Sequence, residues 1–262
     1  MTTRDTPFAP GTPCWVDLLT SDPDKAKSFY GALLGWTSED GGEEFGGYVS
    51  FASDGHGVGG MMRNTPEMGS PDGWTTYIST DDIDATVNRA TEAGGTVMSP
   101  AMAVADLGSM AVLVDPVGAV FGVWQPGKHT GFAKYNEPGS VTWDEHHSKD
   151  FAKSTDFYQK VFGWGIEKTS DTDDFRYYQG QVDGQTVAGM MDSAAFLPAE
   201  VPSHWAVYFS VADVDAAIAT AVDNGGTVIR PAEDTPFGRI ADMSDATGAR
   251  FKLHSEQTVS GS

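Results

Sequence analysis

The sequence repeats itself once over more than a hundred residues, and this duplication constrains the fold more than any other feature. The segment 11–15 recurs 128 residues later as 139–143, and at the same spacing Gly35-Trp36 recurs as Gly163-Trp164. Other matches include Phe29-Tyr30 with Phe157-Tyr158, Gly60-Met61-Met62 with Gly189-Met190-Met191, Asp82-Ile83-Asp84-Ala85 with Asp213-Val214-Asp215-Ala216, Gly94-Gly95 with Gly225-Gly226, and Asp115 with Asp245. A repeat of about 120 residues is far longer than a solenoid unit, so each copy is expected to be a domain.

The duplication divides the 262 residues into two domains and a linker. We predict an N-terminal tail at residues 1–10, domain one at 11–127, a linker at 128–138 and domain two at 139–256. Glycine, lysine and proline interrupt the apolar pattern in the linker. Residues 257–262 are small and polar, which predicts a disordered tail.

The composition is typical of a folded, acidic protein. Apolar residues make up 40% of the chain, and 37 acidic against 16 basic residues give a formal net charge of −21. This charge disfavours nucleic-acid binding and favours cationic or amine-bearing ligands. No apolar stretch has the length of a membrane span, and no secretory signal is evident. The single cysteine, Cys14, has no partner for an internal disulfide. We therefore expect a cytoplasmic protein.

Each domain is predicted to contain the same series of elements twice. Residues 15–20 alternate as in a strand, and Asp22-Pro23 then begins a helix that ends at Gly35. Residues 74–80 are predicted to form a strand and residues 82–93 a helix that Gly94-Gly95 closes. The expected fold is α+β, with four βαβββ modules in all.

Three motifs make the chain resemble a known family. The turn Asp115-Pro116-Val117-Gly118, the Asp-Asp-Ile-Asp-Ala junction at 81–85 and the Phe-Tyr-x-x-x-x-Gly-Trp helix ending at 29–36 are similar to those of the glyoxalase/bleomycin-resistance proteins of the vicinal oxygen chelate superfamily, in particular the two-domain actinobacterial type. The resemblance covers about nine-tenths of the chain. It implies two cup-shaped mixed sheets with the helices outside, each sheet surrounding a cavity. The superfamily includes both enzymes and non-catalytic drug-binding proteins, so the resemblance leaves the function open.

The resemblance also implies where a divalent metal would bind in catalytic members, namely at two histidines and one glutamate of each cup. The matching positions in this chain are Trp15, Thr75 and Gly122 in domain one and Trp143, Ala206 and Lys252 in domain two. None of these six residues is a usual ligand of such metals, and a lysine adds positive charge where a cation would lie. We therefore expect no metal and no other cofactor.

Strand alternation predicts which side chains of domain two face its cavity. In residues 250–254, Phe251 and Leu253 should pack against the helices, so the side chains between them face the other way. The same argument applied to two further strands gives the set Trp143, Glu145, His204, Tyr208, Lys252 and His254. We assign Glu145, His204, Lys252 and His254 to a possible acid/base or carboxylate-binding group, and Trp143 and Tyr208 to ligand contact. The alternative is a structural polar network. His146 falls on the helix-facing side, where the pattern gives it no role.

Domain one presents a different concave face, which is mainly aromatic. The predicted ligand contacts are Trp15, Asp17, Thr75, Tyr77 and Trp124. With Gly122 at the old ligand position, we expect room for a planar ligand to stack, with Asp17 as the only anion. The alternative is that Trp15 and Trp124 are core residues.

Two functions remain open at this point. The favoured hypothesis is a metal-free protein that binds an aromatic antibiotic or polyketide-like metabolite. Its role would be resistance, sequestration or assistance in biosynthesis, and for assistance it would work with a partner biosynthetic enzyme. The alternative is a metal-independent isomerase, lyase or hydratase that acts through domain two, while domain one captures the ligand. In both cases we expect a monomer whose two domains pair like the subunits of a dimer.

Overall fold

Domain one contains eight strands and two α-helices in the computed structural model, which describes residues 3–256. Its strands are β1 (Pro13–Thr20), β2 (Thr37–Asp40), β3 (Val49–Ser53), β4 (His56–Arg63), β5 (Gly73–Ser79), β6 (Thr96–Val104), β7 (Gly108–Val114) and β8 (Val120–Pro126). Its α-helices are α1 (Pro23–Leu34) and α2 (Ile83–Glu92), and two 3₁₀ turns are η1 (Glu43–Phe45) and η2 (Pro66–Met68). These elements include the strands and helices that the sequence predicts, with ends that differ by one or two residues.

Domain two repeats this series in the described part of the chain. Its strands are β9 (Val141–Ser148), β10 (Gly165–Asp171), β11 (Arg176–Val182), β12 (Gln185–Asp192), β13 (His204–Ser210), β14 (Thr227–Thr235), β15 (Gly238–Ser244) and β16 (Arg250–Ser255). Its helices are α3 (Phe151–Phe162) and α4 (Val214–Asp223). The predicted disordered tail at 257–262 lies outside the described residues.

Each domain forms one mixed sheet. The strand order is β2-β3-β4-β1-β5-β8-β7-β6 in domain one and β10-β11-β12-β9-β13-β16-β15-β14 in domain two, so corresponding strands hold corresponding places. Within each sheet the two βαβββ modules meet where the first strands pair antiparallel, β1 with β5 and β9 with β13. The predicted α+β tandem duplication is therefore confirmed. We call the concave faces of the two sheets cup one and cup two.

All four α-helices begin in the same way. An aspartate precedes each helix, and its side chain accepts a hydrogen bond from the backbone N–H three residues further on; these caps are Asp22, Asp82, Asp150 and Asp213. Such a cap stabilises a helix by about 0.5–2 kcal/mol. The helices α1 and α3 both end at a glycine in the left-handed conformation, Gly35 and Gly163, with φ of 69° and 70°.

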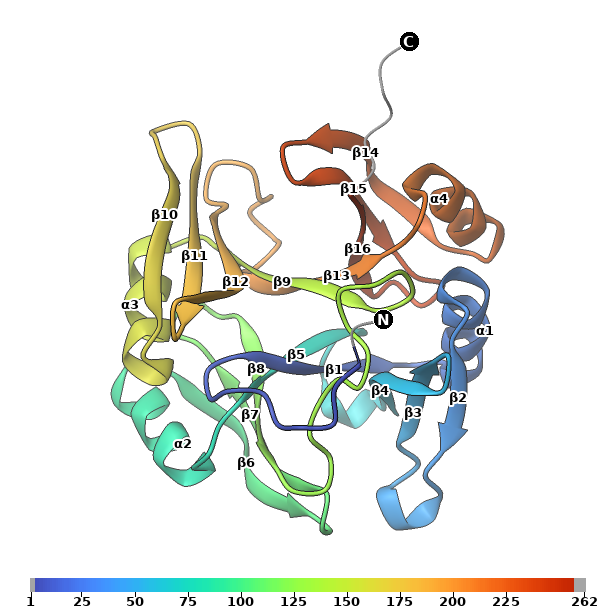
Figure 1. Cartoon of the computed structure of the whole chain (residues 1–262), viewed down its shortest axis with the longest axis horizontal. Helices are drawn as coiled ribbons and strands as arrows, with labels where there is room; N and C mark the ends of the chain where they lie inside the picture. Colours follow the sequence, from blue (N-terminus) through green and yellow to red (C-terminus); the bar gives the residue numbers. More distant parts are fainter. Residues whose placement is uncertain (1–2, 257–262) are drawn as a thin grey trace.

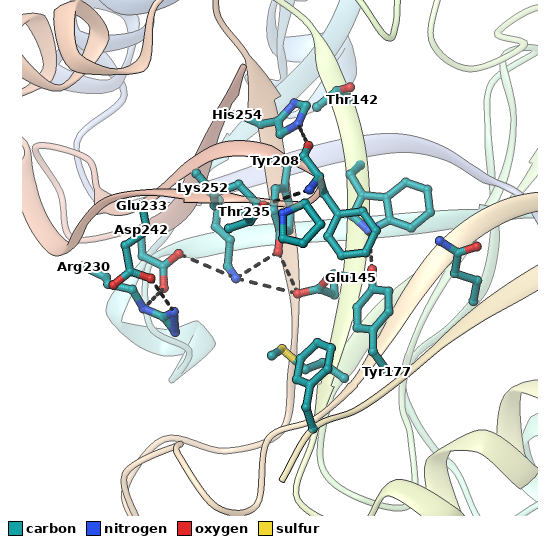
Figure 2. A pocket seen from close by; sticks show the side chains of 17 residues that line it. Thr142, Glu145, Tyr177, Tyr208, Arg230, Glu233, Thr235, Asp242, Lys252 and His254 are labelled. Carbon is teal, nitrogen blue, oxygen red and sulfur yellow. Dashed lines mark hydrogen bonds and ion pairs between the residues drawn. The ribbon is translucent and has the colours of Figure 1, made fainter. Parts of the chain in front are cut away.

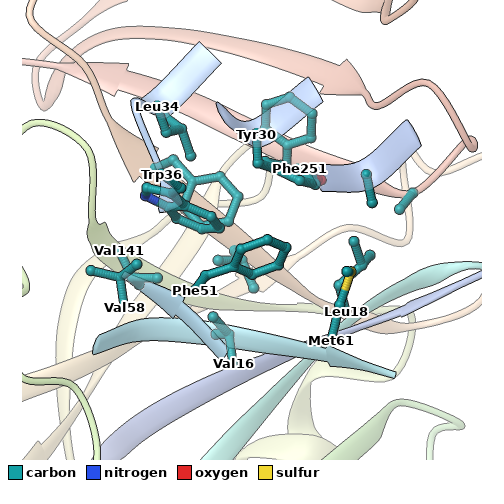
Figure 3. Close-up of a cluster of buried hydrophobic side chains, with 14 of the residues drawn as sticks. Val16, Leu18, Tyr30, Leu34, Trp36, Phe51, Val58, Met61, Val141 and Phe251 are labelled. Carbon is teal, nitrogen blue, oxygen red and sulfur yellow. The ribbon is translucent and has the colours of Figure 1, made fainter. Parts of the chain in front are cut away.

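The two sheets lie back to back, with their central strands in the middle of the molecule and the helices at the two sides (Figure 1). Helix α1 contacts α4 of the other domain, and α2 contacts α3. The hydrophobic core is consequently shared between the domains. Figure 3 shows Tyr30 of α1 beside Phe251 of β16, with ring centroids 6.0 Å apart, and Tyr30 also contacts Phe209 of β13.

Buried hydrogen bonds cross between the domains in a reciprocal manner. Tyr30 of domain one donates to Asp245 of domain two over 3.0 Å, and Tyr158 of domain two donates to Asp115 of domain one over 3.1 Å. Both aspartates also accept bonds from backbone N–H groups of their own turns, for example from the N–H of Ala119. The turn at 115–118 and its repeat at 245–248 therefore each anchor a helix of the other domain.

The structure explains His146, for which the sequence pattern gives no role. Its ring is fully buried on the convex face of sheet two, and Nε2 lies 2.8 Å from Oδ2 of Asp115. The ring also contacts Tyr158 and Trp205 edge-on. The residue at the corresponding position of domain one is Leu18. His146 thus gives Asp115 a second side-chain bond from the other domain, in addition to that of Tyr158, whereas Asp245 accepts one such bond, from Tyr30.

Within residues 3–256 there is no helix with both the length and the apolar character that a membrane crossing requires.

Candidate ligand-binding cavity

Cup two contains a cavity of about 510 Å³, which lies within the range of small-molecule sites. Aromatic side chains form much of its wall, namely Trp143, Phe175, Tyr177, Tyr208 and Phe237. Ionisable side chains lie among them, namely Glu145, Arg230, Glu233, Asp242, Lys252 and His254 (Figure 2). The cavity thus combines a large apolar surface with a few polar groups.

Strand register brings the predicted residues of domain two to one face. In the pairing of β9 with β13, Trp143 lies opposite Tyr208 and Glu145 opposite Ala206, while Tyr208 of β13 also lies beside Lys252 of β16. Residues in register on neighbouring strands point to the same side of a sheet. Five of the six residues in the predicted set therefore line the cavity: Trp143, Glu145, Tyr208, Lys252 and His254.

A chain of hydrogen bonds runs along the cavity floor. The ammonium group of Lys252 donates to the hydroxyl of Tyr208 over 3.0 Å, and this hydroxyl donates to Oε1 of Glu145 over 2.7 Å. Lys252 Nζ also lies 3.7 Å from Glu145 Oε1 and 3.6 Å from Asp242 Oδ1. Asp242 is in turn close to Arg230, 3.7 Å away. The floor is a connected network whose charges partly cancel.

This network keeps Glu145 ionised. Burial of the carboxyl raises its pKa, but the charge of Lys252 and the contacts with His147 and Tyr208 outweigh burial and hold the pKa well below its usual range. A carboxylate of this kind is a weak base, and it carries no proton to donate near neutral pH. Its chemical role in the cavity is therefore that of a fixed negative charge and hydrogen-bond acceptor.

His204 is the one member of the predicted set that does not line the cavity. Its ring stacks on His147 with centroids 5.0 Å apart, and Nδ1 bonds to the carbonyl oxygen of Pro202. His147 lies between His204 and Glu145, with Nε2 2.8 Å from Glu145 Oε1 and Nδ1 bonded to Ser193. Burial and the charge of Lys252 lower the pKa of His147, which disfavours a charged ring. The ring of His147 therefore lies between His204 and Glu145.

Tyr177 is a cavity residue that the sequence analysis missed. Its hydroxyl accepts a hydrogen bond from Nε1 of Trp143 over 3.1 Å. The hydroxyl reaches this place because Gly189 on β12 has no side chain; a Cβ there would lie 2.2 Å from it. The repeated Gly-Met-Met motif was therefore a signal for a tyrosine that crosses the sheet surface, although the motif does not say which tyrosine.

Two exposed phenylalanines flank the cavity and were also missed. Phe175 precedes β11 and is 38% exposed, and Phe237 lies in the turn between β14 and β15 and is 51% exposed. Both rings contact Tyr177, at centroid distances of 6.1 and 6.0 Å. These hairpin tips supply apolar surface at the rim of the cavity.

Cup one contains a similar group of residues, packed closely together. Nε1 of Trp15 donates to Asp17, and the hydroxyl of Tyr48 donates to the same Asp17 oxygen over 2.6 Å. A Cβ at Gly60 would clash with Tyr48, as one at Gly189 would clash with Tyr177. Thr75 lies opposite Asp17 and Tyr77 opposite Trp15 in the pairing of β1 with β5. The trio of tryptophan, tyrosine and carboxylate is thus repeated in both cups.

The two carboxylates of these trios differ in their electrostatics. Burial raises the pKa of Asp17 to about 6, and the hydrogen bonds from Tyr48, Trp15 and Tyr77 oppose this only in part. Domain one has Gly122 where domain two has Lys252. Because no lysine stands at this position in cup one, burial dominates there, and the pKa shift is opposite to that of Glu145.

The structure corrects the expectation of free space in cup one. The ring of Tyr77 fills the place beside Gly122, where a Cβ would lie only 2.1 Å from Cδ1 of Tyr77. The linker fills the cup further: His129 contacts Trp15 at 4.4 Å and Trp124 at 5.3 Å between ring centroids, and its carbonyl accepts a bond from Nε1 of Trp124. The sequence could not show this, because the linker lies far from β1 in the chain.

The residues at the expected metal positions do not fit a divalent metal. The ammonium group of Lys252 occupies the carboxylate position of cup two, while Trp143 and Ala206 provide no donor atom. In cup one the corresponding positions hold Trp15, Thr75 and Gly122. Among the described residues, no group of three His, Cys, Asp or Glu side chains is arranged to hold a metal ion.

Comparisons with known proteins agree with this architecture. The family model of the glyoxalase/bleomycin resistance protein/dioxygenase superfamily matches residues 147–253, and a model of a glyoxalase-like domain matches residues 14–124. Anthracycline biosynthesis protein DnrV of Streptomyces peucetius is 38% identical over 270 residues, covering 95% of this chain and 94% of that protein. CFP32 of Mycobacterium tuberculosis, whose name assigns it provisionally to the glyoxylases, is 37% identical over 94% of this chain and 95% of its own.

Solved structures with the same fold include a metal-bound enzyme and a dioxygenase. The Mn(II)-bound glyoxalase from Novosphingobium aromaticivorans superposes with a TM-score of 0.65 at 16% identity, over 95% of this chain and 83% of that one. A catechol 2,3-dioxygenase superposes with a TM-score of 0.63 at 12% identity, over 97% of this chain and 91% of that one. At such low identity the likeness concerns the fold alone.

Proposed function

Since this chain belongs to the glyoxalase/bleomycin resistance protein/dioxygenase superfamily, we propose that it binds an aromatic small molecule in the cavity of cup two, without a metal. The ligand is of the aromatic antibiotic or polyketide type. The observation that carries the proposal is the 510 Å³ cavity, whose walls are aromatic and whose floor holds a Glu145–Lys252 pair. Pockets with apolar walls and a few fixed polar groups are typical of small-molecule sites.

The ionisable groups of the cavity favour a ligand that is neutral or carries an amine. Three carboxylates, Glu145, Glu233 and Asp242, lie with the two cations Arg230 and Lys252, so a fully ionised set has a net charge of −1. The formal charge of −21 on the whole chain acts in the same direction. The charge of the cavity and the charge of the whole chain would both repel an anionic ligand.

The biological role that we propose is assistance in the biosynthesis of such a metabolite, or its sequestration. The similarity to DnrV, whose name refers to anthracycline biosynthesis, supports the first role and an aromatic polyketide as the ligand. Assistance would involve presenting the ligand to a partner biosynthetic enzyme. Sequestration would confer resistance by lowering the free concentration of the compound.

The metal-independent enzyme is less well supported than binding. Glu145 stays ionised, as described above, and His204 lies outside the cavity lining, so neither is placed to transfer a proton to a ligand. Lys252 and His254 do line the cavity. If turnover exists, it should depend on these two residues, and His254→Ala should abolish it.

A titration with an anthracycline tests the proposed binding. We expect saturable binding in the fluorescence anisotropy of the ligand, and a loss of about 2- to 10-fold in affinity for Phe237→Ala, because an aromatic contact contributes about 0.5–1.5 kcal/mol. The matched control is Phe196→Ala, since Phe196 is similarly exposed at 46% but does not line the cavity. Absence of saturable binding to the unmodified protein would refute the proposal.

The metal-free part of the proposal has its own test. We expect the affinity to be unchanged after dialysis against a chelator, and elemental analysis to find substoichiometric divalent metal. One equivalent of nickel, zinc, iron or manganese that survives dialysis against buffer, and that Glu145→Gln or His204→Ala removes, would contradict it.

A further inference from the structure

The linker of this protein places an aromatic ring inside cup one. His129 lies within the angle formed by Trp15 of β1 and Trp124 of β8, with centroid distances of 4.4 and 5.3 Å and interplanar angles of 84° and 64°. Burial lowers the pKa of His129 to about 4, so the ring is uncharged. Cup one therefore already contains a small neutral aromatic group in edge-on contact with both walls.

Cup two has the same two wall positions. Trp143 corresponds to Trp15, because Trp143 pairs with Tyr208 of β13 as Trp15 pairs with Tyr77 of β5. His254 corresponds to Trp124, because His254 pairs with Ser210 as Trp124 pairs with Ser79. Both Trp143 and His254 line the cavity. Neither ring has an aromatic contact with another side chain within residues 3–256, in contrast to their counterparts.

We propose that one aromatic ring of the ligand binds between Trp143 and His254, in the place that corresponds to His129 in cup one. This inference rests on the proposed function and adds to it the location of the ring and the residues that select for it. The duplicated fold supplies the argument: two cups with the same backbone and the same wall positions offer the same space, which the linker fills in one cup and a ligand fills in the other.

The surrounding contacts narrow the chemistry of this ring. His254 is held in position because its Nε2 donates to the carbonyl oxygen of Phe237 over 2.7 Å, so it acts as a fixed wall. Lys252 lies two residues before His254 on the same face, and within residues 3–256 its ammonium group donates to a single neutral acceptor, the hydroxyl of Tyr208. An oxygen atom on the ligand's ring would give the ammonium group of Lys252 a second neutral acceptor. The ligand class is therefore an uncharged aromatic ring with a hydroxyl or carbonyl oxygen.

The test compares 2-naphthol with decahydro-2-naphthol, which has the same skeleton and hydroxyl group but no aromatic ring. The readout is the imidazole C–H spectrum of the full-length protein, with His254 and His129 assigned from the variants His254→Gln and His129→Gln. We expect 2-naphthol to shift the His254 signal through its ring current and to leave the His129 signal in place. We expect decahydro-2-naphthol to bind at least about fivefold more weakly, since the edge-on contacts are lost.

The possible outcomes separate this inference from the proposed function. If 2-naphthol binds but shifts His129 and not His254, or binds without affecting either, the ring site is wrong and aromatic binding stands. If 2-naphthol and an anthracycline both fail to bind, the proposed function fails, and the ring site with it. Equal affinity for the two alcohols would also overturn the ring site, because the walls would then not distinguish an aromatic ring.

Discussion

Replacing Lys252 by methionine should change the way in which the stability of the protein depends on pH. Lys252 Nζ lies 3.7 Å from Glu145 Oε1, and the lysine side chain is only 13% exposed. At this distance and an effective dielectric constant of about 20, the attraction is about 4 kcal/mol. Removing one partner of a buried pair leaves the other charge uncompensated, so we expect Lys252→Met to lower the free energy of unfolding at pH 7 by about 3–5 kcal/mol.

The sign of the pH effect follows from the pKa of Glu145 in each protein. In the unmodified protein this pKa is lowered, so the interaction stabilises the fold above the unfolded value of about 4.3 and is lost as the pH falls below it. Without Lys252, burial should raise the pKa, as it does for Asp17, where it reaches about 6. A raised pKa favours the fold at low pH. The destabilisation should therefore be smaller at pH 5 than at pH 7, by about 1 kcal/mol.

Urea denaturation at pH 5 and pH 7, followed by tryptophan fluorescence, measures both quantities. A control for charge removal is Lys160→Met, because Lys160 is 61% exposed and forms a surface ion pair with Asp156. This substitution should change the free energy of unfolding by less than about 1 kcal/mol. The double variant Lys252→Met, Glu145→Gln should recover much of the loss, since no buried carboxylate is then left at position 145 without Lys252. A destabilisation that is equal at both pH values, or a double variant as unstable as the single one, would refute the reasoning.

Two further predictions concern the contact between the domains. If residues 11–127 and 139–256 are expressed separately, each half should be unstable or self-associated, because Tyr30 packs on Phe209 and Phe251 across the interface. The two halves should form a folded complex on mixing, and the full chain should sediment as a monomer. Well-folded monomeric halves without mutual affinity would contradict this prediction. The variant His146→Leu has the residue that domain one carries at the corresponding position. It should lower the free energy of unfolding by about 1–3 kcal/mol, because Asp115 loses a buried hydrogen bond. An unchanged midpoint of urea denaturation would show that this bond contributes nothing to stability.

Much of the fold and part of the site follow from local patterns in the sequence. The 128-residue repeat predicts two equivalent domains, and alternation with a period of two places Trp143, Glu145 and Lys252 on one face. Both patterns are properties of the chain itself, so they survive folding unchanged. The same alternation placed His204 on that face correctly but could not show that His147 separates it from the cavity floor.

What the sequence did not predict depends on contacts between distant segments. Tyr177 reaches Trp143 from another strand, and His129 enters cup one from the linker. His146 is explained only by Asp115, which belongs to the other domain. The pKa shift of Glu145 likewise arises from Lys252, which is 107 positions later in the chain. Periodicity carries no information about such pairs.

The fusion of the two domains into one polypeptide has a genetic consequence. In a dimer of identical single-domain chains, every substitution appears in both cups, so a change that closes one cup closes the other. Here Gly122 and Lys252 are encoded separately, as are Trp124 and His254, and each pair has diverged. The bonds of Tyr30 and Tyr158 to the opposite aspartates lie outside the cups. Mutational drift in one binding face therefore leaves the pairing of the copies intact, and one copy is free to serve as scaffold while the other keeps an open pocket.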